Sequence, residues 1–375
     1  MPKFFPILLM FGLPSLYACG SADVEQPTAP PVDARLYQPT AARVAGPQQT
    51  RVEHARESAD AFGRALGEND LKSLTALLDP DVDFSFPGRS SATERNGTLQ
   101  ALSELFGSFS GRKYAASRMW QIGDSAVVEW TMTGVHSGPW MGVNPTQKPV
   151  AIRGVSLLWF NANGLIIDLH LYFDCGAVLA ELGAPPNAAI TTGPVPVLAA
   201  SSALTVASGG PEERANVAIV NASWDALEVK NESGYLAPFA DDVEVTRFDR
   251  VSSDHGKDDR KKFFRWVTTG MSSLAQTPLN AWGAGNFVIE EYTLGGVHSG
   301  KLTTTPPSGH SLRLNYLDIY ELQNGKIARA WTYGNSLELY AQAGVIPNAT
   351  PGVAAPLSPS PASPSPAAPP APKKP

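Results

Sequence analysis

The sequence predicts an α+β protein of two tandem domains, each a curved antiparallel sheet wrapped around about three helices. The pentapeptide Gly-Val-His-Ser-Gly occurs at 134–138 and again at 296–300, so 162 residues separate the two copies. Trp120 and Trp282 precede the two copies at the same separation, which indicates a duplicated domain because solenoid repeats are far shorter. In each copy, helix-like segments come first and long strand-like segments follow, which is the order of an α+β domain.

The repeat also shows which residues of the two domains are equivalent. Glu129 corresponds to Glu291 at the separation of 162, whereas Tyr172 corresponds to Tyr333 at 161. One residue has therefore been lost at a turn between these positions.

Length and composition limit the class of protein. A chain of 375 residues is long enough for two domains of ordinary size, and 43% hydrophobic residues are typical of packed soluble domains. A net charge of −6 gives no basic footprint for nucleic acid, so no nucleic-acid partner is expected. The sequence has neither a Cys/His cluster with metal-ligand spacing nor a Gly-rich nucleotide motif. We therefore expect no cofactor and no metal.

Residues 1–19 predict a bacterial lipoprotein signal peptide. Lys3 precedes an apolar run over 4–17 that is too short to span a membrane, which is typical of a secretory signal. The segment ends in Leu-Tyr-Ala-Cys, which resembles a lipobox whose cysteine, Cys19, becomes diacylated and anchors the protein to a membrane. The Gly-Ser after Cys19, with no Asp, favours the outer over the inner membrane of the cell envelope. The alternative is ordinary signal cleavage with Cys19 incidental.

Three segments have the composition of unstructured chain. Residues 20–50 are rich in Pro, Ala and polar residues and predict a disordered tether. Residues 185–210 predict a linker, and 347–375 predict a disordered tail rich in Pro, Ala and Ser. The two domains are therefore expected at 51–184 and 211–346.

In domain one, apolar residues at helical spacing predict three helices. These residues are Ala55, Ala59, Phe62 and Leu66, then Leu71, Leu74, Leu77 and Leu78, then Leu99, Leu102, Phe106 and Phe109. A short strand is expected at 81–86, and four longer strands are expected near 114–121, 125–135, 150–160 and 165–173.

Domain two repeats this pattern. Its first and third helices are indicated by Val217, Val220 and Trp224 and by Phe263, Trp266 and Val267. Its strands are expected near 279–283, 286–296, 311–322 and 326–334.

A family resemblance follows from the motif around His136. Residues 134–150 resemble the Gly-Thr-His-x-Gly-Pro…Gly-x-x-Pro-Thr-Gly-x-x-Val signature of SnoaL-like polyketide cyclases, with Val135 in place of Thr and Gln147 in place of Gly. In domain two, residues 296–300 and 307–309 resemble the same signature more loosely. The family belongs to the nuclear-transport-factor-2-like superfamily, so the resemblance implies two cone-shaped domains, each with a pocket between sheet and helices.

The resemblance also implies a chemistry. Family cyclases close a ring by intramolecular aldol condensation without a cofactor, and a pocket carboxylate serves as general acid and base. Carried over, that role falls on Asp174, with His170 able to position or share its proton. The equivalent residue of domain two is Asn335, which cannot exchange a proton usefully at neutral pH. Domain one is therefore the expected site of any reaction.

The last strand of each domain alternates between two kinds of side chain. In domain one Asp168, His170, Tyr172 and Asp174 share one face, and in domain two Arg329, Trp331, Tyr333 and Asn335 do so. These rows either line the pocket, which the aromatic residues favour, or form a solvated outer face. The candidate ligand-binding residues are His136, Tyr172, Trp159, His298, Trp331, Tyr333 and Asn335.

Other residues have more ordinary interpretations. His136 and His298 each end a long strand, where a structural hydrogen bond to the backbone is the simpler role. Glu129 and Glu291 could pair across strands or reach a pocket. Cys175 is expected to be an inert buried thiol because no activating base is evident.

Three hypotheses about function remain open. The first is an exported, lipid-anchored protein that binds a small apolar or polyketide-like molecule, in two pockets or in one pocket beside a scaffold. The second is a cofactor-free cyclase or isomerase that acts through Asp174. The third is a structural role, in which the two domains pack sheet to sheet as an intrachain pseudo-dimer.

Overall fold

The computed structural model describes residues 48–89, 91–184, 203–248, 253–302 and 305–346. Both expected domains, 51–184 and 211–346, lie within these ranges apart from residues 90, 249–252 and 303–304. The predicted signal peptide with Cys19, most of the tether, most of the linker and the C-terminal tail lie outside the described residues.

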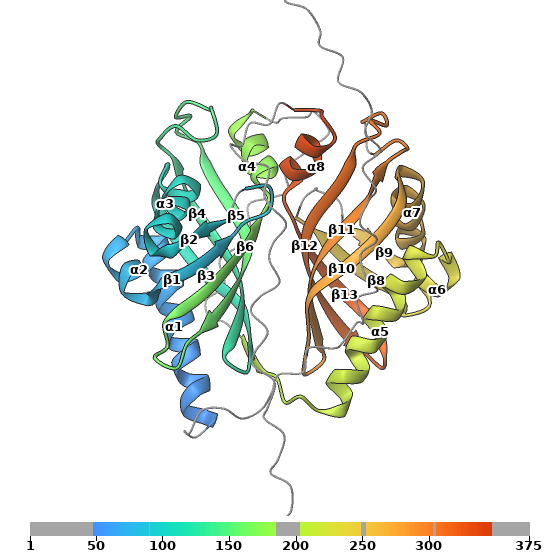
Figure 1. Ribbon diagram of the computed structural model, residues 1–375, viewed down its shortest axis with the longest axis horizontal. Helices are drawn as coiled ribbons and strands as arrows, with labels where there is room; N and C mark the ends of the chain where they lie inside the picture. Colours follow the sequence, from blue (N-terminus) through green and yellow to red (C-terminus); the bar gives the residue numbers. More distant parts are fainter. Residues whose placement is uncertain (1–47, 90, 185–202, 249–252, 303–304, 347–375) are drawn as a thin grey trace, which may run out of the picture. The chain divides into compact units, whose positions relative to one another are not determined.

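Domain one contains a curved sheet with helices on one side (Figure 1). Its elements are α1 (Gln48–Glu68), α2 (Leu71–Leu77), β1 (Leu78–Ser85), β2 (Ala92–Thr93), α3 (Glu94–Phe106), β3 (Phe109–Ile122), β4 (Ser125–His136), β5 (Pro149–Phe160), β6 (Ile166–Phe173) and α4 (Cys175–Leu182). The strand order is β2-β1-β6-β5-β4-β3-β7, in which β7 (Ala203–Val206) lies within the segment predicted as linker. The β1–β6 and β3–β7 pairs are parallel and the others are antiparallel.

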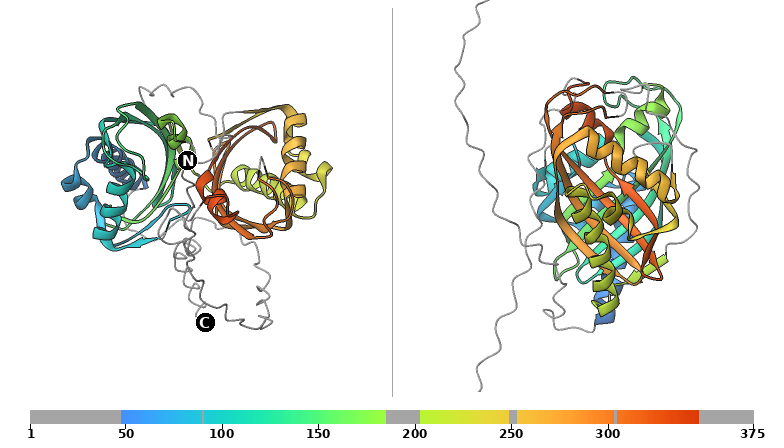
Figure 2. Two further views of the ribbon diagram at one scale, coloured as in Figure 1. Left: turned by 90° about the horizontal axis from the view of Figure 1, so that it is seen from above. Right: turned by 90° about the vertical axis from the view of Figure 1, so that its right-hand side faces the viewer.

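Domain two repeats this architecture. Its elements are α5 (Pro211–Glu228), α6 (Glu232–Leu236), β8 (Phe239–Arg247), β9 (Asp254–His255), α7 (Gly256–Gly270), β10 (Met271–Ala284), β11 (Phe287–His298), β12 (Ser311–Gln323), β13 (Lys326–Tyr333) and α8 (Ser336–Gln342). The strand order is β10-β11-β12-β13-β8-β9, in which only β13–β8 is parallel. Seen from above, each sheet curls around the helices of its own domain (Figure 2). The predicted α+β class, with one curved sheet around helices in each domain, is confirmed.

Side-chain alternation gives each sheet two different faces. In β4, Val128, Trp130 and Met132 point to the helix side and join the core of domain one. Glu129 and Thr131, the residues between them, are also buried but lie on the other face of the sheet. We call the helix side the inner face and the opposite side the outer face. Both faces are covered, which is why β4 has almost no exposed residue.

The structure differs from the predicted elements in several places. The strand expected near 279–283 is β10, which begins at Met271. The third helix ends at Phe106, and Phe109 instead begins β3, five residues before the predicted strand. The second helix ends at Leu77, so Leu78 belongs to β1. Each domain also ends in a short helix, α4 or α8, that was not predicted. Both are only seven or eight residues long, too short for a clear apolar period.

Candidate ligand site in domain two

The predicted polar row of β6 lies on the outer face of domain one. His170 Nδ1 is 2.6 Å from Glu291 Oε1, and the Tyr172 hydroxyl donates to the same oxygen at 2.7 Å. Both side chains are fully buried. The row therefore faces neither the interior pocket nor solvent, because a carboxylate of domain two covers it. Alternation along the strand was predicted correctly, but the sequence does not show what covers the face.

The predicted catalytic residue Asp174 serves as a helix cap. Its Oδ1 accepts hydrogen bonds from the Gly176 backbone at 2.9 Å and from the Ser336 backbone and hydroxyl at 2.9 and 2.7 Å. Asn335 caps α8 in the same manner, with Oδ1 accepting from the Leu337 backbone at 3.3 Å. Asp and Asn are equally good N-caps, so the exchange between the two domains preserves this structural role.

The other candidate ligand residues on the outer face make similar contacts. The Tyr333 hydroxyl donates to Glu129 Oε1, and the Arg118 guanidinium lies 3.7 Å from the Trp331 ring centroid. The Trp159 ring centroid lies 4.8 Å from that of His170 in its own domain and 6.1 Å from that of Trp282 in domain two. These candidates are brought together, but against the other domain's side chains.

His136 and His298 hold the loops that follow β4 and β11. Nδ1 of His136 accepts from the Thr146 backbone at 3.2 Å, and Nδ1 of His298 accepts from the Ser308 backbone at 3.3 Å. Burial lowers the pKa of both imidazoles, which favours the neutral form that this acceptor role requires.

A different polar row crosses the inner face of domain two. Glu290 on β11 lies directly beside Asp318 on β12, which lies beside Thr332 on β13, which lies beside Arg247 on β8. All four are buried. The motif positions shared by the two domains do not reveal this row, because the residues of the row differ between the domains. The available signal was an acidic residue in the middle of each of two apolar strands.

The row borders a small cavity of about 30 Å3 between the sheet and the helices of domain two. Asp318, Thr332 and Arg247 line it. Further lining side chains, mostly rings, come from the helices, β8 and β11–β13; they include Ser223, Trp224, Tyr235, Arg260, Phe263, Tyr292 and Tyr320. A polar interior with convergent aromatic side chains is typical of a small-molecule site.

Asp318 is held by two tyrosines but keeps one oxygen free. The hydroxyls of Tyr320 and Tyr292 donate to its Oδ2 at 2.7 and 3.1 Å. In the described part of the chain, Oδ1 is buried and has no hydrogen-bond partner. Burial raises the pKa of Asp318, although Tyr320, Thr332 and Arg247 oppose the shift.

Glu290 is buried beside Asp318, and only 1% of its surface is exposed. Gln276 Nε2 donates to its Oε1 at 2.7 Å. The hydrogen bonds from Gln276 and Trp224 lower the pKa of this carboxyl group. Its Oε2 makes no hydrogen bond among the described residues. Burial, with a smaller contribution from the charge of Asp318, raises the pKa of Glu290 to about 8. At neutral pH this carboxyl group is therefore protonated and can donate a hydrogen bond.

A buried arginine closes the helix side of the cavity. Arg260 Nη1 donates to Asp254 Oδ2 at 2.6 Å, and Nη2 donates to the Tyr235 hydroxyl. Its guanidinium lies 4.3 Å from the ring centroid of Phe263. Asp254 balances its charge, which a buried cation requires.

Domain one carries no acidic side chain where domain two carries this row. The equivalents of Glu290, Asp318 and Thr332 are Val128, Ser156 and Leu171, which are paired across the same strands. The Ser156 hydroxyl is satisfied by Trp130 Nε1 at 2.9 Å. Around them, the ring centroids of Phe86 and Phe106 lie 4.9 and 5.4 Å from that of Phe173. The interior of domain one is thus a packed hydrophobic core.

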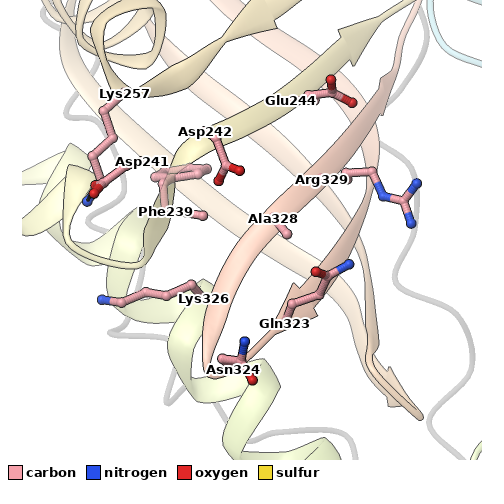
Figure 3. Close-up of a pocket in the computed structure, with 11 residues that line it drawn as sticks. Phe239, Asp241, Asp242, Glu244, Lys257, Gln323, Asn324, Lys326, Ala328 and Arg329 are labelled. Carbon is pink, nitrogen blue, oxygen red and sulfur yellow. Dashed lines mark ion pairs between the residues drawn. The ribbon is translucent and has the colours of Figure 1, made fainter.

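Domain two also has a wide polar groove at its surface, with a volume of about 560 Å3 (Figure 3). It lies where the pairing of β8 with β13 shifts register. Lys257 Nζ pairs with Asp241 Oδ1 at 2.8 Å, and Arg329 Nη2 pairs with Glu321 Oε2 at 2.6 Å. Its charged side chains are largely paired with one another or with the backbone, as for Lys326 with the Ala237 carbonyl.

Among the described residues, no group of three or more His, Cys, Asp and Glu side chains is arranged to hold a metal ion. In the same part of the chain, no helix combines the length and the apolar character needed to cross a membrane.

Comparison with known proteins identifies both domains. Residues 59–169 match the family model of the SnoaL-like domain, and residues 219–343 match that of the SnoaL-like polyketide cyclase. The chain carries two SnoaL-like domains in tandem. The family resemblance inferred from the residues around His136 is thereby confirmed. No curated protein matches the chain significantly.

Parts of the chain are similar to several solved structures. A protein from Jannaschia sp. CCS1, assigned as a SnoaL-like polyketide cyclase, is 22% identical, covers 39% of this chain and 100% of its own, and gives a TM-score of 0.34. IdmH from Streptomyces antibioticus, assigned as a polyketide cyclase, is 24% identical over 34% of this chain and 98% of its own, with a TM-score of 0.31. A nuclear-transport-factor-2-like protein of unknown function from Burkholderia pseudomallei is 21% identical over 34% of this chain and 97% of its own, with a TM-score of 0.30.

Proposed function

We propose that this chain binds a small molecule in the interior of domain two and that domain one serves as a packed scaffold. The observation that carries the proposal is the pair of buried carboxyl oxygens, Asp318 Oδ1 and Glu290 Oε2, without hydrogen-bond partners in the described chain. Leaving such groups unsatisfied costs stability, roughly 1–3 kcal/mol each. A ligand that hydrogen-bonds to them would recover this free energy.

The lining suggests the chemistry of the ligand. The unpartnered Oδ1 of Asp318 can accept a hydrogen bond, whereas protonated Glu290 can donate one, so the ligand is expected to carry a hydroxyl or amide beside a carbonyl. Trp224 and Tyr292, with ring centroids 4.8 Å apart, offer an apolar surface for its body. A small polyketide-like molecule meets both requirements. The cavity of about 30 Å3 accommodates little more than one water, so such a ligand must displace lining side chains.

The first experiment is native mass spectrometry of the purified protein, followed by thermal melting with a panel of small aromatic alcohols and hydroxy ketones. We expect one bound molecule per chain and a raised melting temperature with at least one compound. Thr332→Leu, which fills the cavity with the residue found in domain one, should abolish the shift. Thr246→Leu, the same chemical change on the outer face, is the matched control and should retain it. A panel that shifts none of the three proteins, or all three equally, would contradict the proposal.

A specific observation supports a second role for domain one, as one half of an intrachain pseudo-dimer. Tyr172 donates to Glu291, and its equivalent Tyr333 donates to Glu129, the equivalent of Glu291. Such reciprocal contacts are typical of a two-fold symmetric interface. Apolar side chains of both outer faces surround them in one buried cluster.

A double-mutant cycle tests this packing. Tyr333→Phe and Glu129→Gln should each lower stability, and the cycle should give a coupling free energy of about 1 kcal/mol or more, because hydrogen bonds to a buried charge are strong. A coupling of zero would show that the two side chains do not meet in solution.

Export and lipid anchoring at Cys19 are also part of the proposal, and the predicted signal peptide supports them. Labelling of cells with a palmitate analogue should tag the wild-type protein but not the Cys19→Ser variant. An untagged wild type found in the soluble fraction would leave ordinary signal cleavage as the better explanation.

A further inference from the structure

Two equivalent buried glutamates lie on the outer faces of the sheets, and each is neutralised differently. Glu129 is paired within its own domain. Arg118 donates to it from Nε at 2.6 Å and from Nη2 at 2.9 Å. Although burial alone would raise the pKa of Glu129, Arg118 and the hydroxyl groups of Tyr333 and Ser117 lower it overall. This carboxylate is therefore ionised and matched by a cation of domain one.

Among the described residues of domain two, no cation hydrogen-bonds to Glu291. The residue equivalent to Arg118 is Asn280, whose Nδ2 donates to Glu291 Oε2 at 2.6 Å but is neutral. Of the described side chains that hydrogen-bond to Glu291, which are His170, Tyr172 and Asn280, only His170 of domain one can carry a positive charge. Burial alone would raise the pKa of Glu291, but His170, Tyr172 and Asn280 lower it overall.

His170 carries the charge that this position requires. Burial opposes the imidazolium, but Glu291 and Asp168 outweigh it and raise the pKa of His170 to about 10. Its Nε2 lies 3.2 Å from Asp168 Oδ1 on the same strand. Asp83 on β1 also contributes a carboxyl group close enough to be affected by His170. Glu291, Asp168 and Asp83 are all acidic. The ring is therefore protonated at neutral pH.

Trp331 is the residue of domain two that corresponds to His170. It stacks over Arg118 of domain one, with the guanidinium carbon 3.7 Å from the ring centroid. At Glu129, the cation therefore comes from the same domain and the ring comes from the other one. At Glu291, the amide comes from the same domain and the cation comes from the other one.

We infer that the outer face of domain two fits domain one as its partner and rejects a second copy of itself. In a pairing of two such faces, Trp331 and Tyr333 would meet Glu291 and Asn280, which leaves a buried carboxylate without a cation. Such a charge is strongly destabilising when its partner is missing. A pairing of two domain-one faces would instead place His170 against Arg118, where Trp331 now lies. The inference rests on the proposed packing of the two outer faces.

The test exchanges these residues in the full chain. His170→Trp should lower the melting temperature by about 10 °C, because it removes the cation that hydrogen-bonds to Glu291. Adding Asn280→Arg should recover most of this loss, because it recreates at Glu291 the Arg and Trp arrangement found at Glu129. Asn280→Arg alone should not stabilise the protein, since His170 already supplies the charge. A double variant that melts no higher than His170→Trp would overturn the inference.

The mirror exchange is the matched control. Arg118→Asn should lower the melting temperature, and adding Trp331→His should restore part of it by placing a cation opposite Glu129. The inference would also be overturned if neither double variant melts at a higher temperature than its parent single variant. If the Tyr333–Glu129 cycle shows coupling but neither rescue works, the proposed packing of the two outer faces is supported and the different charge partners of Glu129 and Glu291 do not set which face pairs with which. If the cycle shows no coupling, the packing itself fails.

A pH profile separates charge from shape. The pKa of His170 is raised above its ordinary value near 6.5, so its contribution to stability is full below pH 6.5 and is lost as the pH rises towards 10. The His170→Trp/Asn280→Arg double variant should lose less stability than the wild type over this range, since Arg does not titrate there. Parallel profiles would show that His170 acts only through its shape and would contradict the inference.

Discussion

The two domains share a fold and a strand order, but their inner faces carry opposite kinds of side chain. At one row across the sheet, domain one has Val128, Ser156 and Leu171, and domain two has Glu290, Asp318 and Thr332. In domain one the row is part of a core in which aromatic rings pack against one another. In domain two it borders a cavity and contains two carboxyl groups with raised pKa values.

This difference separates stability from function. Buried apolar side chains stabilise a domain, whereas buried carboxyl groups without full hydrogen bonding destabilise it. The fold tolerates the apolar row, as domain one shows, so the polar row of domain two is not needed for folding. A chain with two such domains can keep one as a stable scaffold while the other retains a costly polar interior.

The largest expected effect comes from the core of domain one. Trp130→Ala should lower the free energy of unfolding by about 3–5 kcal/mol, because the fully buried indole leaves a cavity. Urea denaturation followed by circular dichroism measures this loss. Ligand-induced melting shifts in domain two should survive wherever the variant remains folded. Loss of those shifts in a folded variant would show that the two interiors are not independent.

Replacing a polar residue of domain two with its domain-one equivalent should have the opposite effect on stability. Glu290→Val removes a buried carboxyl group and introduces the residue that domain one carries at this position. We expect stability to rise by about 1–3 kcal/mol, since burial of the group is costly. Ligand retention in native mass spectrometry should fall. Lower stability with retained ligand would mean that Glu290 serves the fold rather than the cavity.

The pH dependence of stability should reveal the ionisation of Glu290 through comparison with Glu290→Gln, a variant of nearly the same size. The folded-state pKa of Glu290, about 8, lies above the ordinary value of 4.5, so the folded protein holds an extra proton between these values. Stability is therefore favoured at low pH and is lost as the pH rises through 8. Glu290→Gln removes this loss, and the slopes of stability against pH should differ by up to about 1.4 kcal/mol per pH unit. Denaturation curves from pH 5 to 9 measure the difference; identical slopes would mean that Glu290 is ionised in the folded state.

The fold was predictable because its signal is long and repeated. Strand alternation in β6 correctly placed Asp168, His170 and Tyr172 on one face, since the period of a strand is two residues. What covers that face depends on Glu291, which lies 121 residues further along the chain from His170. No local pattern contains this information, so the row was assigned to a pocket or to solvent.

The candidate site was harder to predict because it consists of differences between the domains. Motif positions such as His136 and His298 are shared, and they hold loops. Glu290 and Asp318 each stand in an apolar strand, and their meeting follows from the register of β11 and β12. Comparing the two halves position by position, after the fold was predicted, would have shown acidic residues only in domain two.

The smallest expected effect concerns Asp174. Asp174→Asn should change the free energy of unfolding by less than about 1 kcal/mol, because Asn335 makes the equivalent cap of α8 and Asn is as good a cap as Asp. Asp174→Ala, which removes the cap, should cost about 1–2 kcal/mol by the same urea measurement. The pair also separates the two roles assigned to this residue: a catalytic carboxylate would be inactivated by either change, whereas a cap would be weakened only by alanine. Turnover that disappears in a stable Asp174→Asn variant would therefore return the reaction to domain one and remove the division of roles between the two interiors.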